Sequence, residues 1–153
     1  MTIIKELHQD KGQVCKRILE SLPIWFGIEK AILDYALAIE SMPMFVIENQ
    51  AGEILAFLAL DFHNEFNAEI HVMAVLPDFH GKGLGTALVE KAKQYSKAKG
   101  LQYLTVKTMS PSKPNREYDL TRKFYQKLGF VPLEEFKTLW SEANPCLLMI
   151  KNL

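Results

Sequence analysis

A glycine-rich segment between an apolar run and an amphipathic run constrains the fold of this chain more than any other feature. Glycines at positions 81, 83 and 85 follow the predominantly apolar residues 69–76 and precede helical periodicity over residues 86–99. Glycine permits positive φ and close approach of a ligand to the backbone. A helix that starts after such a turn presents unpaired N–H groups and a positive dipole end. The segment therefore predicts a buried strand, a turn that binds an anion such as pyrophosphate, and a helix.

Hydrophobic periodicity and breaker residues predict the remaining elements. A strand–helix–strand crossover over residues 70–108 implies a parallel pair. The predicted order is β-α-α-β-β-β-α-β-α-β-β, an α/β class with a mixed, mostly antiparallel sheet in one domain spanning residues 1–153. We expect further strands over residues 2–8, 45–47, 53–61, 101–108, 130–139 and 146–151, and further helices over residues 12–22, 28–41 and 118–128.

Composition narrows the functional classes. The 18 basic and 18 acidic residues give a formal net charge of zero, which argues against nucleic-acid and membrane-surface partners. Cys15 and Cys146 lie far apart, so we expect free thiols and neither a zinc site nor a disulfide framework. No apolar run approaches the ~18 residues that span a bilayer, and no leader pattern is visible. We expect a cytoplasmic protein without a bound metal.

The glycine-rich turn alone leaves alternatives open. It can be purely structural, or it can bind a nucleotide. It is not a P-loop, because the chain has no GxxxxGK[ST] motif, and it is not a dinucleotide fingerprint, because a third glycine would fall on Thr86. The turn by itself predicts only an anion site.

Three features together resemble the GNAT superfamily of N-acetyltransferases. The turn resembles the signature [RQ]-x-x-G-x-[GA], with His80, Gly83 and Gly85 at its defined positions and histidine as the departure. Residues 68–75 resemble the family's central strand. Residues 121–130, which end in FYxKxGF, resemble its second conserved helix. The element order agrees along essentially the whole chain.

This resemblance implies the GNAT fold, with about seven strands and four helices, and acetyl-CoA as the acyl donor. It also implies transfer to a primary amine by direct attack on the thioester. Arg122 and Lys123 would then either meet cofactor phosphates or lie on a solvated face. The implied cofactor-binding residues are Met73, Ala74, Val75, His80, Gly81, Lys82, Gly83, Leu84, Gly85, Thr86 and Tyr125.

The implied catalytic groups are Met73, Glu69 and Tyr125. The Met73 backbone N–H would polarise the thioester carbonyl, Glu69 would act as base, and the Tyr125 hydroxyl would protonate the leaving thiolate. Alternation along the strand puts Glu69, His71 and Met73 on one face, so the base is Glu69, His71 or a water chain. Glu69 is alternatively a solvated strand-end residue, and Tyr125 a packing residue.

Aromatic side chains mark candidate acceptor-binding segments. Such residues line pockets for partly apolar amines or stack on cations, although they also form cores and dimer interfaces. The loop over residues 110–118 would form a lid or rim. The acceptor would be a small molecule or a peptide, including a protein N-terminus or lysine. A non-catalytic acyl-CoA sensor is the alternative from another class. The expected acceptor-binding residues are Trp25, Phe26, His71, Tyr118 and Trp140.

Overall fold

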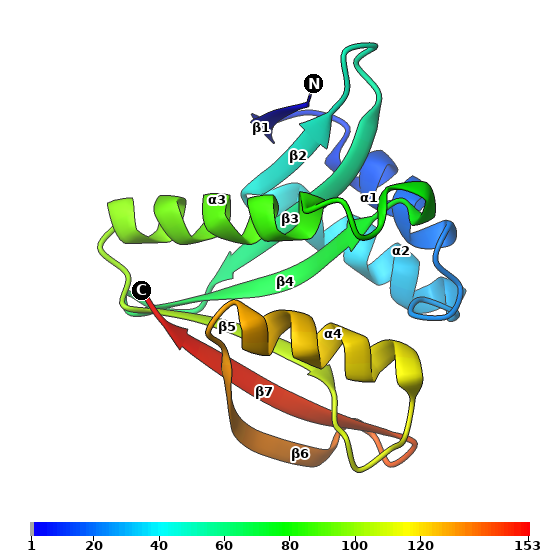
Figure 1. Cartoon of the computed structure of the whole chain (residues 1–153), viewed down its shortest axis with the longest axis vertical. Coiled ribbons are helices and arrows are strands. Elements are labelled where there is room, and N and C mark those ends of the chain that lie inside the picture. Colours follow the sequence, from blue (N-terminus) through cyan, green and yellow to red (C-terminus); the bar gives the residue numbers. More distant parts are fainter. Residues whose placement is uncertain (1) are drawn as a thin grey trace. The chain divides into compact units, whose positions relative to one another are not determined.

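The computed structural model describes residues 2–153 and has the predicted order of strands and helices (Figure 1). Two short 3-10 turns, η1 (Ile39–Ser41) and η2 (Pro77–Phe79), add to it. The strands are β1 (Ile3–Leu7), β2 (Met44–Glu48), β3 (Ile54–Phe62), β4 (Asn67–Val75), β5 (Tyr103–Met109), β6 (Val131–Ser141) and β7 (Asn144–Asn152). The α-helices are α1 (Lys11–Glu20), α2 (Glu29–Ala38), α3 (Leu84–Ala98) and α4 (Arg116–Lys127).

The strands form a mixed sheet, which confirms the predicted α/β class. Its hydrogen-bonded order is β1-β2-β3-β4-β5-β7-β6. β4 and β5 pair in parallel, as the crossover between them predicts, from Asn67↔Tyr103 to Ile70↔Val106. The pairs β1–β2, β2–β3, β5–β7 and β6–β7 are antiparallel.

The chain folds into two compact units. Unit 1 comprises residues 1–61 and 71–95, and unit 2 comprises residues 62–70 and 96–153. The boundary between Ile70 and His71 falls inside β4, so this strand contributes residues to both units.

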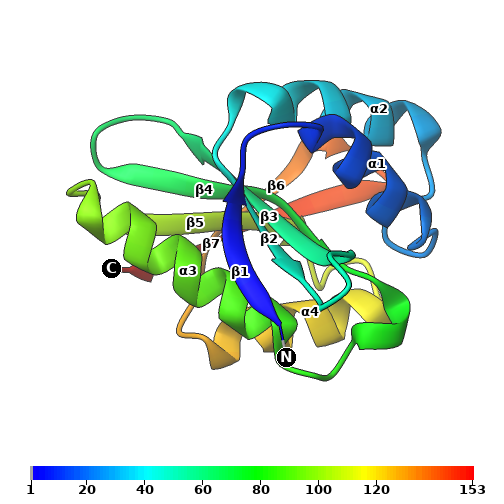
Figure 2. The same ribbon diagram turned by 90° about the horizontal axis from the view of Figure 1, so that it is seen from above.

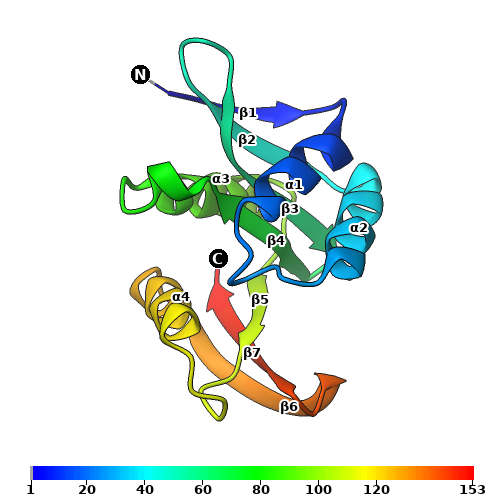
Figure 3. The ribbon, with the colours of Figure 1, turned by 90° about the vertical axis from the view of Figure 1, so that its right-hand side faces the viewer.

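In unit 1, helices cover both faces of the strands. Helices α1 and α2 lie on one face, and α3 lies on the other (Figures 2 and 3). Successive residues of a strand point their side chains to opposite faces of the sheet. Met44 and Val46 pack with buried residues of α1 and α2, whereas Phe45 contacts Tyr95 of α3, with ring centroids 5.0 Å apart.

Helices α1 and α2 approach closely at Gly12. A Cβ atom there would lie 2.7 Å from the Ala36 carbonyl oxygen, so only glycine fits without a backbone shift. The Gly12 N–H donates to the Glu40 carboxylate at 2.8 Å, and the Lys11 ammonium donates to the Met42 carbonyl at 2.6 Å. These contacts hold the start of α1 to the residues that lead into β2.

In unit 2, α4 lies against the face of β5 and β7 (Figures 1 and 3). Asn115 caps the N-terminus of α4, since its side-chain oxygen accepts from the Tyr118 N–H at 3.0 Å. Gly129, with φ of 97°, ends the helix in the left-handed region that favours glycine. Among residues 2–153, no helix is long and apolar enough to cross a membrane.

Candidate functional site

The glycine-rich turn links η2 to α3 in unit 1. Gly81 and Gly83 have φ of 74° and 82°, so both occupy the left-handed region. No heavy atom lies within 4 Å of the position that a Cβ would take at either glycine. The backbone conformation therefore requires these glycines, and both Cβ positions face open space.

Helix α3 starts earlier than the periodicity predicts. It begins at Leu84, so Leu84, Gly85 and Thr86 form its first turn instead of the end of the loop. That turn carries no acidic residue, and the helix is 15 residues long. The unpaired N–H groups of a long helix thus follow Gly83 directly, without a carboxylate that would repel an anion.

His80, where the signature has Arg or Gln, has a structural partner on each side. Its Nε2 donates to the Val75 carbonyl oxygen at 2.7 Å. The Trp25 ring packs edge-on against the imidazole, with centroids 5.8 Å apart. The histidine side chain therefore ties the turn to the end of β4 and to the connection between α1 and α2. Lys82 Nζ lies 5.3 Å from the centre of the Phe79 ring.

A second aromatic group in unit 1 joins two of the predicted acceptor-binding residues. The Tyr35 ring of α2 contacts Phe26 at 6.1 Å and His71 at 5.4 Å, both edge-on. Burial along β4 alternates, with His71 and Met73 partly exposed between buried neighbours. Tyr35 is not among the predicted site residues, because its spacing in the sequence fits an ordinary apolar helix face.

The residues expected to bind the pantetheine arm lie at the end of β4. Met73, Ala74 and Val75 are the last three residues of the strand. Met73 and Val75 are half-buried, and Ala74 is buried.

Glu69 is buried in unit 2 among polar partners, not solvated at a strand end. Its side chain is 7% exposed. Lys107 Nζ donates to both carboxylate oxygens, at 3.1 and 3.0 Å, and His63 Nε2 lies 2.5 Å from Oε1. Because a carboxylate only accepts hydrogen bonds, all three contacts donate to it.

The parallel register explains why Lys107 reaches Glu69. Glu69 pairs with Thr105, and Lys107 lies two residues further along β5 on the same face. The Thr105 hydroxyl donates to the Asn67 side-chain oxygen at 3.2 Å, which makes this face of the ladder polar. His63 directly follows β3, and its N–H donates to the Asn67 carbonyl at 3.2 Å. Sequence reasoning missed His63 and Lys107, since only register brings them to Glu69.

Tyr125 lies on α4 and is 5% exposed. Its ring contacts Phe124 and Phe130, with centroids 5.2 and 5.4 Å away. Burial raises the pKa of its hydroxyl, so the group stays protonated at neutral pH. This hydroxyl makes no hydrogen bond to any other residue in the range 2–153. It is therefore a protonated donor that no described group engages.

The other residues expected from α4 and β6 have different surroundings. Arg122 is 5% exposed and donates to the Asp119 carboxylate and the Met109 carbonyl. It fixes α4 to the end of β5 and does not lie on a solvated face, which corrects one of the two expectations for it. Tyr118 is half-buried in the first turn of α4, and Trp140 on β6 is 45% exposed.

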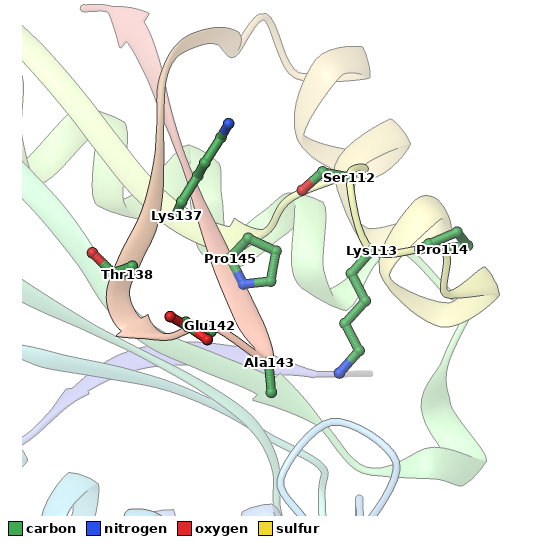
Figure 4. Close-up of a pocket in the computed structure, with 8 residues that line it drawn as sticks. All are labelled: Ser112, Lys113, Pro114, Lys137, Thr138, Glu142, Ala143 and Pro145. Carbon is green, nitrogen blue, oxygen red and sulfur yellow. The ribbon is translucent and has the colours of Figure 1, made fainter.

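A pocket of about 530 Å³ lies in unit 2 between the β5–α4 loop and the β6–β7 hairpin (Figure 4). Glu135 braces this loop by accepting hydrogen bonds from the Ser110 and Ser112 hydroxyls, and these bonds lower its pKa. The loop thus borders this recess, and its role as a lid or rim of the acceptor site stays a prediction. The lining residues are Ser112, Lys113, Pro114, Lys137, Thr138, Glu142, Ala143 and Pro145.

Comparison with known proteins finds relatives along much of the chain. An uncharacterized N-acetyltransferase from Chlorobaculum tepidum is 26% identical over 111 residues, which cover 71% of this chain and 64% of that relative. Another from Methanocaldococcus jannaschii is 40% identical over 92 residues, covering 56% of this chain and 38% of that relative. The chain therefore spans less than two thirds of the length of either relative.

A solved structure shares the fold over nearly its full length. The GNAT family acetyltransferase from Elizabethkingia anophelis, with acetyl-CoA bound, aligns with a TM-score of 0.77 and 18% identity. The alignment covers 99% of this chain and 98% of that one. Residues 13–130 match the acetyltransferase (GNAT) family. This matched range includes both the glycine-rich turn and the end of α4. The chain therefore belongs to the GNAT family of acetyltransferases.

Proposed function

We propose that this protein transfers the acetyl group of acetyl-CoA to a primary amine of a small molecule or peptide. The observation that carries the proposal is the turn from His80 to Gly85. Two glycines in the left-handed region lead directly into the N-terminus of a 15-residue helix. Such a helix end binds phosphate groups through its free N–H groups.

The turn fits the pyrophosphate of coenzyme A. Both Cβ positions at Gly81 and Gly83 are open, so the backbone can approach a ligand there. The first turn of α3 lacks acidic residues, and Lys82 adds a positive charge beside it. The backbone of Met73–Val75, at the end of β4, would bind the pantetheine arm in the manner of an added strand.

The chain would supply three groups to the reaction. Bound acetyl-CoA brings an activated thioester. The Met73 N–H would polarise the thioester carbonyl, and the cluster containing Glu69 would take a proton from the acceptor ammonium. The Tyr125 hydroxyl, which burial keeps protonated, would donate a proton to the leaving sulfur.

Two features of the chain are candidate acceptor sites. The first is the aromatic group of Phe26, Tyr35 and His71 in unit 1, which suits a cation or an apolar body. The second is the pocket in unit 2, which Lys113, Lys137 and Glu142 line with charges of both signs. The amine library described below distinguishes a small-molecule acceptor from a peptide.

The first experiment is a thermal-shift panel with the full chain. Acetyl-CoA and coenzyme A at 100 times their Kd should stabilise the protein by about 2.7 kcal/mol. ATP and NAD at the same concentrations should leave the melting temperature unchanged. Equal stabilisation by ATP would contradict the assignment of the turn to coenzyme A.

The second experiment separates an enzyme from an acyl-CoA sensor. Thiol release from acetyl-CoA is measured against a library of amino sugars, polyamines, amino acids and peptides. Amine-dependent release above the rate without protein supports the transferase. Tight acetyl-CoA binding with no release in any well would instead indicate a sensor.

A further inference from the structure

The cluster around Glu69 contains an exposed imidazole, that of His63, to which the proposed mechanism gives no separate role. The His63 side chain is 41% exposed, Lys107 is 30% exposed, and Glu69 is 7% exposed. The buried carboxylate thus lies beneath two basic side chains, of which His63 is the more open to solvent. A molecule arriving from solvent meets the imidazole more readily than the carboxylate.

The contact with Glu69 fixes the hydrogen positions on this imidazole. A carboxylate only accepts hydrogen bonds, so the 2.5 Å contact places a hydrogen on His63 Nε2. In a neutral ring the other nitrogen, Nδ1, then carries a lone pair. Nδ1 makes no hydrogen bond to any other residue in the range 2–153. The ring is therefore oriented as a proton acceptor with its accepting atom available.

Glu69 is less suited to take the proton directly. Lys107 donates to both its oxygens and His63 donates to one, so three of about four lone-pair sites are occupied. Protonation of the carboxylate would weaken these charge-assisted hydrogen bonds. A carboxylate that holds one ring nitrogen so that the other can act as base is a recurring catalytic arrangement. Lys107 in turn fixes the carboxylate and balances its charge.

We propose that His63 is the general base of the acetyl transfer, with Glu69 and Lys107 as positioning residues. This assignment rests on the proposed function. The acceptor ammonium gives one proton to His63 Nδ1, which leaves a free amine and an imidazolium whose Nε2–H faces the Glu69 carboxylate. The amine nitrogen bonds to the thioester carbon, and the C–S bond breaks with its electron pair going to sulfur. The Tyr125 hydroxyl gives its proton to that sulfur, and the second amine proton replaces it on the Tyr125 oxygen.

The charged groups around His63 are consistent with this role. Glu69 of β4 and Lys107 of β5 face it directly or through the carboxylate, and Asp61 precedes it by two residues on β3. Cys146 of β7 interacts electrostatically with both Lys107 and Glu69, and its buried thiol has a raised pKa of about 11. Cys146 is therefore a neutral neighbour at physiological pH and does not compete for the proton.

The test compares His63→Gln with His8→Gln, the same change at a histidine whose side chain is 75% exposed. With acetyl-CoA and an amine identified by the screen, His63→Gln should lower kcat and kcat/KM together by about 10²-fold or more. His8→Gln should match the native protein. Free imidazole should restore part of the rate of His63→Ala and should not accelerate the native protein.

A spectroscopic readout accompanies the kinetics. Nitrogen-15 NMR of the full chain should show His63 as the Nε2–H tautomer, and Glu69→Gln should shift it towards the Nδ1–H form, because an amide can donate to Nε2. Melting curves check that each variant is folded.

The outcomes separate the two claims. If His63→Gln turns over as fast as the native protein, or if His63 of the native protein is the Nδ1–H tautomer, the assignment of His63 is overturned. The proposed function is then left intact. A rate lost in Glu69→Gln but retained in His63→Gln assigns the base to Glu69. Absence of turnover by the native protein with every amine overturns the proposed function, and the role of His63 with it.

Discussion

At the scale of single residues, Tyr125 carries a role that depends on one atom. Its ring packs between Phe124 and Phe130, and these contacts need no hydroxyl. Its hydroxyl has a raised pKa and no hydrogen-bond partner among residues 2–153. Removal of the oxygen should therefore separate packing from chemistry.

Tyr125→Phe should lower kcat by about 10²-fold, because a positioned proton donor contributes that order of rate. The melting temperature should change little, since the substitution leaves no donor or acceptor unpaired. Thiol-release kinetics at saturating acetyl-CoA check the rate. Tyr103→Phe makes the same change at a tyrosine that is 36% exposed and serves as the control. A kcat equal to that of the control would make Tyr125 a packing residue.

At the scale of elements, Gly83 in the turn before α3 can be compared with a glycine in a turn for which no ligand is proposed. Gly83 has φ of 82°, and Gly52, in the turn between β2 and β3, has φ of 80°. Neither has a heavy atom within 4 Å of its Cβ position. Alanine at either position therefore meets the same backbone strain and no steric clash, which makes the pair a matched comparison.

Gly83→Ala and Gly52→Ala should each destabilise the fold by roughly 1–2 kcal/mol, the cost of a left-handed conformation with a Cβ atom. Only Gly83→Ala should also weaken acetyl-CoA binding, because its methyl group points into the space proposed for the pyrophosphate. Urea denaturation measures the first effect, and isothermal titration calorimetry measures the second. Equal affinities in the two variants would argue against a ligand at the turn.

At the scale of the whole molecule, each compact unit contains one buried thiol. Cys15 belongs to unit 1 and Cys146 to unit 2, and both are 0% exposed. Burial raises their pKa values from 9.0 to about 12 and about 11. At pH 8 the reactive thiolate is therefore roughly 10³-fold and 10²-fold rarer than in the unfolded chain.

Both thiols should resist alkylation in the native protein and react in urea, with mass spectrometry locating each label. Because β4 contributes residues to both units, unfolding of either unit disorders a shared strand. We therefore expect both thiols to become reactive at one common urea midpoint, and separate midpoints would show independent unfolding.

The raised pKa values of the two thiols also predict how the free energy of unfolding depends on pH. It should not depend on these thiols below pH 9 and should fall as pH rises above it, since only the unfolded thiols ionise there. Urea denaturation at a series of pH values measures this effect.

Much of the fold could be predicted from short-range patterns. The periodicity of residues 12–22 gave α1, and that of residues 118–128 gave α4, with errors only at their ends. Helix ends were harder to predict, because α3 begins at Leu84 where glycines conceal the start of the periodicity. The assignment of residues to two compact units could not be predicted, because it depends on contacts between distant segments.

The sequence by itself determined the order of elements, the parallel pair and the position of the glycine-rich turn, because these depend on residues close together in the chain. Only the tertiary structure decided the surroundings of Glu69, Arg122 and His80. Lys107 lies 38 residues from Glu69 in sequence and reaches it through the register of two parallel strands. Trp25 meets His80 across 55 residues. Such partners are set by how strands align and helices dock, and no local pattern encodes that alignment.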